Sequence, residues 1–130
     1  MEQGVLKNMT FISTGPRVFV VNEPLKVHGD GYRNTIDISS AAEYGEFVFL
    51  TPPGADVPAD PEASLQGMRL KLHSFGPRDF LLPIGHPMLI AWAASLAARA
   101  NRGSIAMLHW HSRQRRYFPV RAQVYVDQST

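Results

Sequence analysis

The stretch LHWHSRQRRYFPV, residues 108–120, combines side chains that can bind metals, anions or aromatic rings. His109 and His111 are two residues apart, so on a β-strand both imidazoles point to the same face. Two imidazoles on one face can begin a transition-metal site, but a third ligand is required. The other histidines offer the right donor atom, and no spacing in the sequence places them nearby. A metal site at His109 and His111 is therefore one hypothesis.

Arginines and aromatic residues surround the same stretch and suit a polyanionic partner. Guanidinium groups neutralise phosphates, and aromatic rings stack on unpaired bases. The residues expected to bind nucleic acid or a protein partner are Arg113, Arg115, Arg116, Tyr117, Arg121 and Tyr125. Trp110 alternates with the two histidines, so it is expected on the opposite face of the strand. The alternative interpretation is a solvated tip whose charges protect an edge hairpin from aggregation.

A second candidate is the turn PIGHPM, residues 83–88, which joins an apolar segment to a helical one. In open α/β sheets, ligands bind beyond the carboxyl ends of the strands, and a helix N-terminus there attracts anions. Gly85 and His86 are the anion-binding candidates, and His86 can also cap the helix or act as an acid or base. The loop TPPG, residues 51–54, would complete a small crevice if the two strands were neighbours. The alternative is an ordinary strand-to-helix turn.

Common enzyme signatures are missing from the sequence. It contains no G-x-G-x-x-G, Walker A, G-x-S-x-G or H-E-x-x-H motif. It also has no cysteine, which excludes a disulfide framework, a cysteine-ligated zinc site and a thiol nucleophile. Whether the protein is an enzyme stays open, with the balance towards a non-catalytic protein. No cofactor is expected.

Charge is unevenly distributed along the chain. Residues 1–62 hold four bases and nine acids, whereas residues 63–130 hold nine bases and two acids. This asymmetry indicates an anionic partner for the basic part, unless the two parts neutralise each other in the fold. Eight of the nine bases in the second part are arginines, which favour planar, bidentate contacts.

Local sequence signals predict the elements that position these residues. The expected strands span residues 17–22, 35–39, 46–50, 79–85, 104–111 and 117–126, and the expected helices span residues 60–75 and 86–103, with one helical turn at 39–45. A turn is expected at residues 28–34 and a proline-rich loop at residues 51–61. Residues 67–73 also alternate like a strand. Asp60 and Pro61 nevertheless form a helix start signal, and residues 60–75 contain no β-branched side chain, which favours the helix.

The alternation of strands and helices indicates parallel βαβ units with right-handed crossovers. The expected fold is therefore α/β, a small three-layer Rossmann-like sandwich with a mostly parallel sheet and a C-terminal antiparallel edge hairpin. The tip of that hairpin is expected to be SRQRR. We expect a single domain over residues 1–130, with N-terminal strands or an arm over residues 1–45 and a βαβαββ core over residues 46–126.

The composition is that of a globular protein. Hydrophobic residues make up 45% and charged residues 18%, which excludes a disordered chain. No run approaches the roughly 18 apolar residues of a membrane span, and the N-terminus lacks the apolar core of a signal peptide. We expect a cytoplasmic protein, in the host cytoplasm if it is viral, without a membrane partner. A homo-oligomer stays open.

Three functional hypotheses follow from these observations. The leading one is a non-catalytic binding module that contacts a phosphate-bearing partner, foremost nucleic acid, through the basic C-terminal half. The alternative is a protein-interaction component, either a viral or phage structural part or a modulator of a host protein. The third is a nucleotide- or metal-dependent enzyme with its site at residues 83–88. A compact layout without enzyme motifs is typical of the accessory proteins of phages and other mobile elements.

Overall fold

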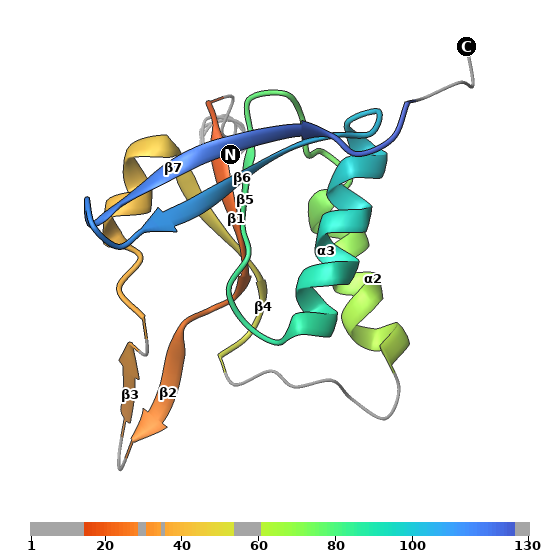
Figure 1. Cartoon of the computed structure of the whole chain (residues 1–130). Coiled ribbons are helices and arrows are strands. Elements are labelled where there is room, and N and C mark those ends of the chain that lie inside the picture. Colours follow the sequence, from red (N-terminus) through yellow and green to blue (C-terminus); the bar gives the residue numbers. More distant parts are fainter. Residues whose placement is uncertain (1–14, 29–30, 35, 54–60, 127–130) are drawn as a thin grey trace, which may run out of the picture.

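The computed structural model describes residues 15–28, 31–34, 36–53 and 61–126, and it shows a five-stranded sheet with helices packed against it (Figure 1). The sheet contains β1 (Arg17–Asn22), β4 (Glu46–Thr51), β5 (Phe80–Leu82), β6 (Ser104–His111) and β7 (Arg116–Gln123). The remaining elements are a separate hairpin of β2 (Leu25–His28) and β3 (Gly31–Asn34), a 3-10 helix η1 (Ser39–Tyr44), and the helices α2 (Pro61–Leu72) and α3 (Pro87–Ala100). No helix in this part of the chain is long and apolar enough to cross a membrane.

The strand order is β4-β1-β5-β6-β7. The first four of these strands are parallel, and β7 runs antiparallel to β6. A mostly parallel α/β sheet with an antiparallel edge hairpin is thereby confirmed, as is the order of elements from residue 46 onward. β1 lies inside the sheet between β4 and β5, so the sheet includes a strand from outside the expected core of residues 46–126. The strand order reverses beside β1, which is where open α/β sheets form ligand crevices.

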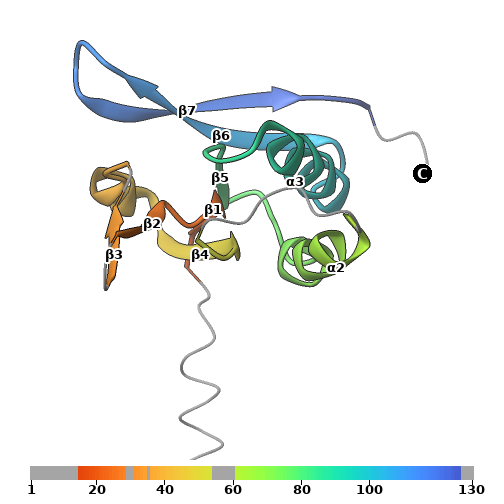
Figure 2. The same cartoon turned by 90° about the horizontal axis from the view of Figure 1, so that it is seen from below.

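Both α-helices cover the same face of the sheet, and η1 lies on the other (Figure 2). Successive residues of the central strands β1 and β5 point to opposite faces of the sheet. Phe19 and Leu81 pack with α2 and α3, whereas Val20 and Leu82 pack in the cluster that includes Ala41 of η1. The Rossmann-like three-layer arrangement is not confirmed, because the second face carries a six-residue 3-10 helix instead of a layer of α-helices.

Each α-helix begins at a proline and is shorter than expected, since α2 ends at Leu72 instead of residue 75 and α3 at Ala100 instead of residue 103. α2 begins at Pro61, so the helical interpretation of residues 60–75 is confirmed and the strand alternative at 67–73 is wrong. At the start of α3, His86 Nδ1 accepts a hydrogen bond from the backbone N–H of Met88 at 3.1 Å. Beyond its end, Gly103 has a φ of +86° and donates its N–H to the carbonyl of Ala98.

Three expected elements differ from the structure. Of the strand expected at residues 35–39, the described residues 36–39 do not form one: Asp37 Oδ1 accepts from the backbone N–H of Ser39 at 2.9 Å, a local bond that competes with a strand ladder. Residues 28–34 are not simply a turn, because β3 occupies Gly31–Asn34 and pairs with β2. The strand expected at 79–85 is reduced to Phe80–Leu82, since Pro83 has no N–H to continue the ladder. Residues 35 and 54–60 lie outside the described part.

An ion pair that no sequence motif predicts joins the start of β1 to the loop before β5. Asp79 is only 5% exposed and accepts from the backbone N–H of Arg17 at 3.0 Å and from its Nη2 at 2.9 Å. The backbone N–H of Gly76 donates to the same carboxylate at 2.9 Å. Because a buried carboxylate needs such partners, this pair fixes the amino end of the central strand against its neighbour.

Candidate binding cleft

A cleft of about 780 Å³ opens on the face of the sheet that the α-helices leave uncovered. The carboxyl end of β5 contributes to it, together with the segment that leads into η1 and the outer half of the β6–β7 hairpin. Its lining consists of Ile36, Asp37, Ser39, Ser40, Leu82, Pro83, Ile84, Leu108, His109, Trp110, Arg115 and Tyr117. Segments far apart in the sequence therefore share one concavity, which is mostly apolar with a few polar groups, as ligand sites generally are.

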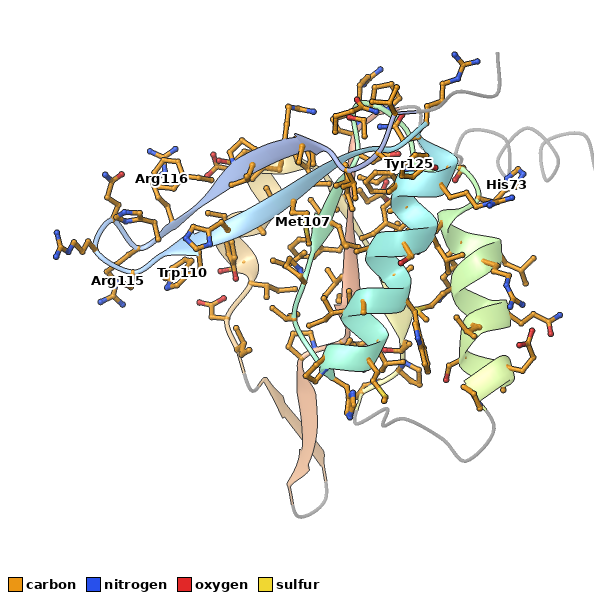
Figure 3. The ribbon with its side chains drawn as sticks, turned by 45° about the vertical axis from the view of Figure 1, so that its right-hand side comes forward. His73, Met107, Trp110, Arg115, Arg116 and Tyr125 are labelled. Atoms are coloured by element: carbon orange, nitrogen blue, oxygen red, sulfur yellow. The ribbon has the colours of Figure 1, made fainter. Side chains whose placement is uncertain are left out.

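The hairpin side of the cleft carries an aromatic pair and a cation. Trp110 is 42% exposed. Its ring packs edge to face against the ring of the buried Tyr117, with the ring centroids 4.9 Å apart. Arg115 ends the tip turn in a left-handed conformation, with a φ of +52°. Figure 3 shows Arg115 and Trp110 on the same side of the hairpin. This side of the cleft can therefore stack a planar ring beside a positive charge.

The opposite side of the cleft carries a carboxylate. The hydrogen bond from the Ser39 backbone N–H, followed by one from its side chain, holds the pKa of Asp37 below its ordinary value. Asp37 is therefore ionised at neutral pH and can only accept hydrogen bonds. Burial raises the pKa of the Tyr117 hydroxyl, and the nearby charge of Asp37 raises it further. The cleft thus contains a hydrogen-bond acceptor near the aromatic pair.

The tip arginines differ in how strongly they are engaged. The turn comprises residues 112–115, one residue shorter than the expected tip, because Arg116 is already the first residue of β7. Arg116 lies 4.0 Å from a carboxylate oxygen of Glu43 and 5.0 Å from the centre of the Phe118 ring. Within the described part of the chain, Arg113 and Arg115 have no ion pair or hydrogen-bonded side-chain partner. These two arginines are available to an anion.

Two residues of the predicted set lie away from the tip. The guanidinium of Arg121 sits 5.3 Å from the centre of the Phe80 ring, and its Nη1 donates to the carbonyl of Pro77 at 3.4 Å. Tyr125 follows the end of β7 and lies at the other end of the hairpin from Arg115 (Figure 3). The structure therefore brings together the tip arginines and Tyr117, and it separates them from Arg121 and Tyr125.

The two histidines lie on the opposite face of the hairpin from Trp110, as alternation predicts. His111 contacts the Phe118 ring, with centroids 5.6 Å apart, and its Nδ1 accepts from the backbone N–H of Gln114 at 3.3 Å. His109 reaches the border of the cleft. Among the residues that the structure describes, no group of three or more His, Cys, Asp or Glu side chains is placed to hold a metal ion. The structure thus offers this pair no further ligand of those types in that part of the chain.

The turn at residues 83–88 has a structural role. β4 and β5 flank β1, so the two loops that follow them share one sheet edge, with Asn22 of β1 between them. Asn22 donates from Nδ2 to Thr51 Oγ1 at 2.6 Å and accepts at Oδ1 from the backbone N–H of His86 at 3.0 Å. A Cβ on Gly85 would collide with the Asn22 side chain. The backbone N–H groups of His86 and Met88 thus already donate to side chains, those of Asn22 and His86.

Sequence reasoning missed the η1 side of the cleft. Asp37, Ser39 and Ser40 become site residues only because the crossover from β1 to β4 passes beneath the hairpin. The hydroxyl of Tyr44 in η1 donates to the backbone carbonyl of Tyr117 at 2.8 Å and holds the two sides together. The one local signal was the Asp-x-Ser spacing at residues 37–39, which is typical of a helix start.

Comparison with known families matches the chain to the phage Pam3 gp32-like protein family over residues 16–124. The chain belongs to this family. The match extends from just before β1 to just after β7, so it covers the whole sheet, both α-helices and the cleft. Membership agrees with the expected viral character, and the family description names no activity. No curated protein and no solved structure matches the chain.

Proposed function

We propose that this phage family member is a non-catalytic module that binds nucleic acid at the tip of the β6–β7 hairpin. The observation that carries the proposal is the position of Arg115 beside Trp110 at the border of the cleft. An arginine neutralises a backbone phosphate, and an exposed indole stacks on a base. Arg113 in the same turn offers a second phosphate contact.

The distribution of the other arginines limits this contact to the tip. Arg99 and Arg102 lie at the C-terminal end of α3, where β6 begins. The eight residues of β6 separate that end from the tip by roughly 27 Å, at about 3.4 Å per residue. The basic half of the sequence is therefore not one basic surface. A short contact with about two or three phosphates is expected, and its affinity should depend on salt accordingly.

A salt titration with single-stranded DNA and RNA tests the proposal. The logarithm of the association constant should fall with the logarithm of salt concentration with a slope of about −1.4 to −2.1, since each phosphate contact on a single strand contributes about −0.7. Combined Arg113→Ala, Arg115→Ala and Arg116→Ala should abolish this slope. The matched control is Arg78→Ala, Arg99→Ala and Arg102→Ala, which removes the same charge elsewhere and should keep the slope. Absence of binding at about 50 mM salt, or equal binding by both triple variants, would overturn the proposal.

A second candidate function is a protein contact through β7 and the segment that follows it. Val120 of β7 is 53% exposed, and Val124 and Val126, which follow the end of the strand, are 63% and 70% exposed. Exposed apolar side chains that gather on a surface are typical of a protein-binding site. Val120→Ser with Val124→Ser should then abolish co-purification of a phage or host protein, whereas the tip variants and nuclease treatment should leave it intact. A partner lost on nuclease treatment would instead support nucleic-acid binding.

A further inference from the structure

The shape of the cleft suits one planar ring better than a duplex. Its volume of about 780 Å³ lies within the ordinary range of small-ligand sites. Leu82, Ile84 and Leu108 supply apolar lining, and Trp110 leaves 42% of its surface exposed at the border. A base inside a duplex is stacked on both faces and cannot enter such a hollow, whereas an unpaired base can.

The charge of Asp37 indicates which part of a nucleotide enters. An ionised carboxylate repels a phosphate but accepts hydrogen bonds from the N–H groups of a base. Its Oδ1 accepts from the backbone N–H of Ser39 at 2.9 Å, which holds the carboxylate in place. A carboxylate offers about four acceptor positions, so acceptor capacity is left for a ligand. Arg115 lines the same cleft from the hairpin, where it can meet the phosphate.

We infer that the cleft holds one unpaired guanine of a single-stranded nucleic acid, with Asp37 accepting from its N1–H and N2–H₂ groups. Guanine is the base whose pairing edge presents two adjacent donor groups, which match the two oxygens of a carboxylate. The pairing edges of adenine, cytosine, thymine and uracil place acceptors beside a single donor group. The inference rests on the proposed nucleic-acid function and adds to it a preferred base and the requirement for a single strand.

The test compares oligonucleotides of about ten nucleotides, a length within the usual range of single-strand sites. Each carries one central guanine, hypoxanthine or adenine in a thymidine or uridine background, and a duplex of the guanine sequence is added. Hypoxanthine lacks only the N2 amino group, so it removes one of the two donor groups without any change in the protein. The guanine strand should bind about tenfold more tightly than the hypoxanthine and adenine strands, and more tightly than the duplex.

Variants assign the preference to the cleft. Asp37→Asn replaces an acceptor oxygen with a donor, so the guanine preference should disappear while salt-dependent binding persists. Glu46→Gln is the matched control, because it removes an exposed acid at the start of β4 that does not line the cleft, and it should keep the preference. Trp110→Ala should remove the advantage of single strands over the duplex. Thermal unfolding verifies that each variant is folded, and the hypoxanthine comparison needs no variant.

The outcomes separate the two proposals. If no oligonucleotide binds, both the proposed function and this inference fail. If binding depends on the tip arginines but duplex and single strands, or guanine and hypoxanthine, bind equally, the proposed function stands and the inference is overturned. A guanine preference that persists in Asp37→Asn overturns it as well.

Discussion

At the scale of single residues, Asn22 links the segments that meet at the carboxyl edge of the sheet. It is 8% exposed and joins Thr51 of β4 to His86 at the start of α3. Gly85 must lack a side chain to let Asn22 reach that position, and its φ of +123° is unfavourable for any other residue. A turn that the sequence predicts as a ligand site thus serves to connect three elements.

Gly85→Ala is expected to destabilise the protein by about 2 kcal/mol or more, because it adds backbone strain and displaces Asn22. Gly67→Ala is the matched control. Gly67 lies inside α2, where an added methyl group would have no neighbouring atom within 4 Å, so alanine should stabilise the protein by about 0.5–1 kcal/mol. Urea unfolding measures both changes, and effects of the same sign would contradict the prediction.

Tyr117 gives the protein a predictable response to alkaline pH. Its pKa in the folded state is raised above the ordinary value of 10.0, mainly by burial. The contribution of this hydroxyl to the free energy of unfolding is therefore complete below about pH 10. It is lost as the pH rises towards the folded-state pKa, because the tyrosine ionises first in the unfolded chain. Between about pH 9 and pH 11, the wild-type protein should lose more free energy of unfolding than Tyr117→Phe. Equal losses in urea unfolding would show that this hydroxyl does not contribute.

At the scale of elements, Pro119 protects the exposed edge of β7. Val124 donates its N–H to the carbonyl of Gly103, so these two residues form a hydrogen-bonded pair. In an antiparallel ladder every second pair is hydrogen-bonded, so the pairs that contain Val120 and Phe118 are hydrogen-bonded and the pair that contains Pro119 is not. Val120 and Phe118 therefore direct their backbone groups to β6, while position 119 directs its nitrogen outward. A proline there costs no ladder bond and removes one donor from the edge that another strand would use.

Pro119→Val should increase self-association, because it restores an edge N–H and adds a β-branched side chain. Sedimentation velocity over a concentration series measures the effect. Pro77→Ala is the control, since Pro77 is an exposed proline outside the sheet. If Pro119→Val sediments like the wild-type protein at every concentration, the proline does not protect this edge.

At the scale of the whole molecule, one sheet supports two clusters of buried side chains. Consecutive residues of β1 and β5 belong to different clusters, so neither cluster can lose its packing while the strands keep their register. Trp92 of α3 packs on the helical side, and Trp110 lies on the other side beside Tyr117. The two tryptophans therefore report on the two sides of a unit that should unfold as one.

Single-tryptophan variants test this cooperativity, and with it the expectation of a single domain. Trp92→Phe leaves Trp110 as the reporter, and Trp110→Phe leaves Trp92. In each variant the fluorescence midpoint in urea should coincide with the circular dichroism midpoint within experimental error, because a two-state transition looks the same to every probe. If the Trp110 fluorescence of Trp92→Phe has its midpoint at a clearly lower urea concentration than the circular dichroism, the outer half of the hairpin unfolds independently.

Much of the fold could be predicted because its signals are local. The Asp60-Pro61 start, the His86 cap and the Gly103 ending each depend on neighbours a few residues away, and alternation predicted the two strands of the hairpin. The errors at residues 36–39 and 79–85 arose where a side chain or a missing N–H outweighed strand propensity.

The sequence by itself determined most of the elements, their order from residue 46 onward and the basic hairpin tip. Only the tertiary structure decided that β1 is central, that Asn22 contacts the turn at Gly85 and His86, and that Asp37 shares a cleft with Trp110 and Arg115. The physical reason is that contacts between residues far apart in the sequence depend on the order of strands in the sheet. That order results from many weak packing contacts between distant residues, and no short stretch of sequence records them.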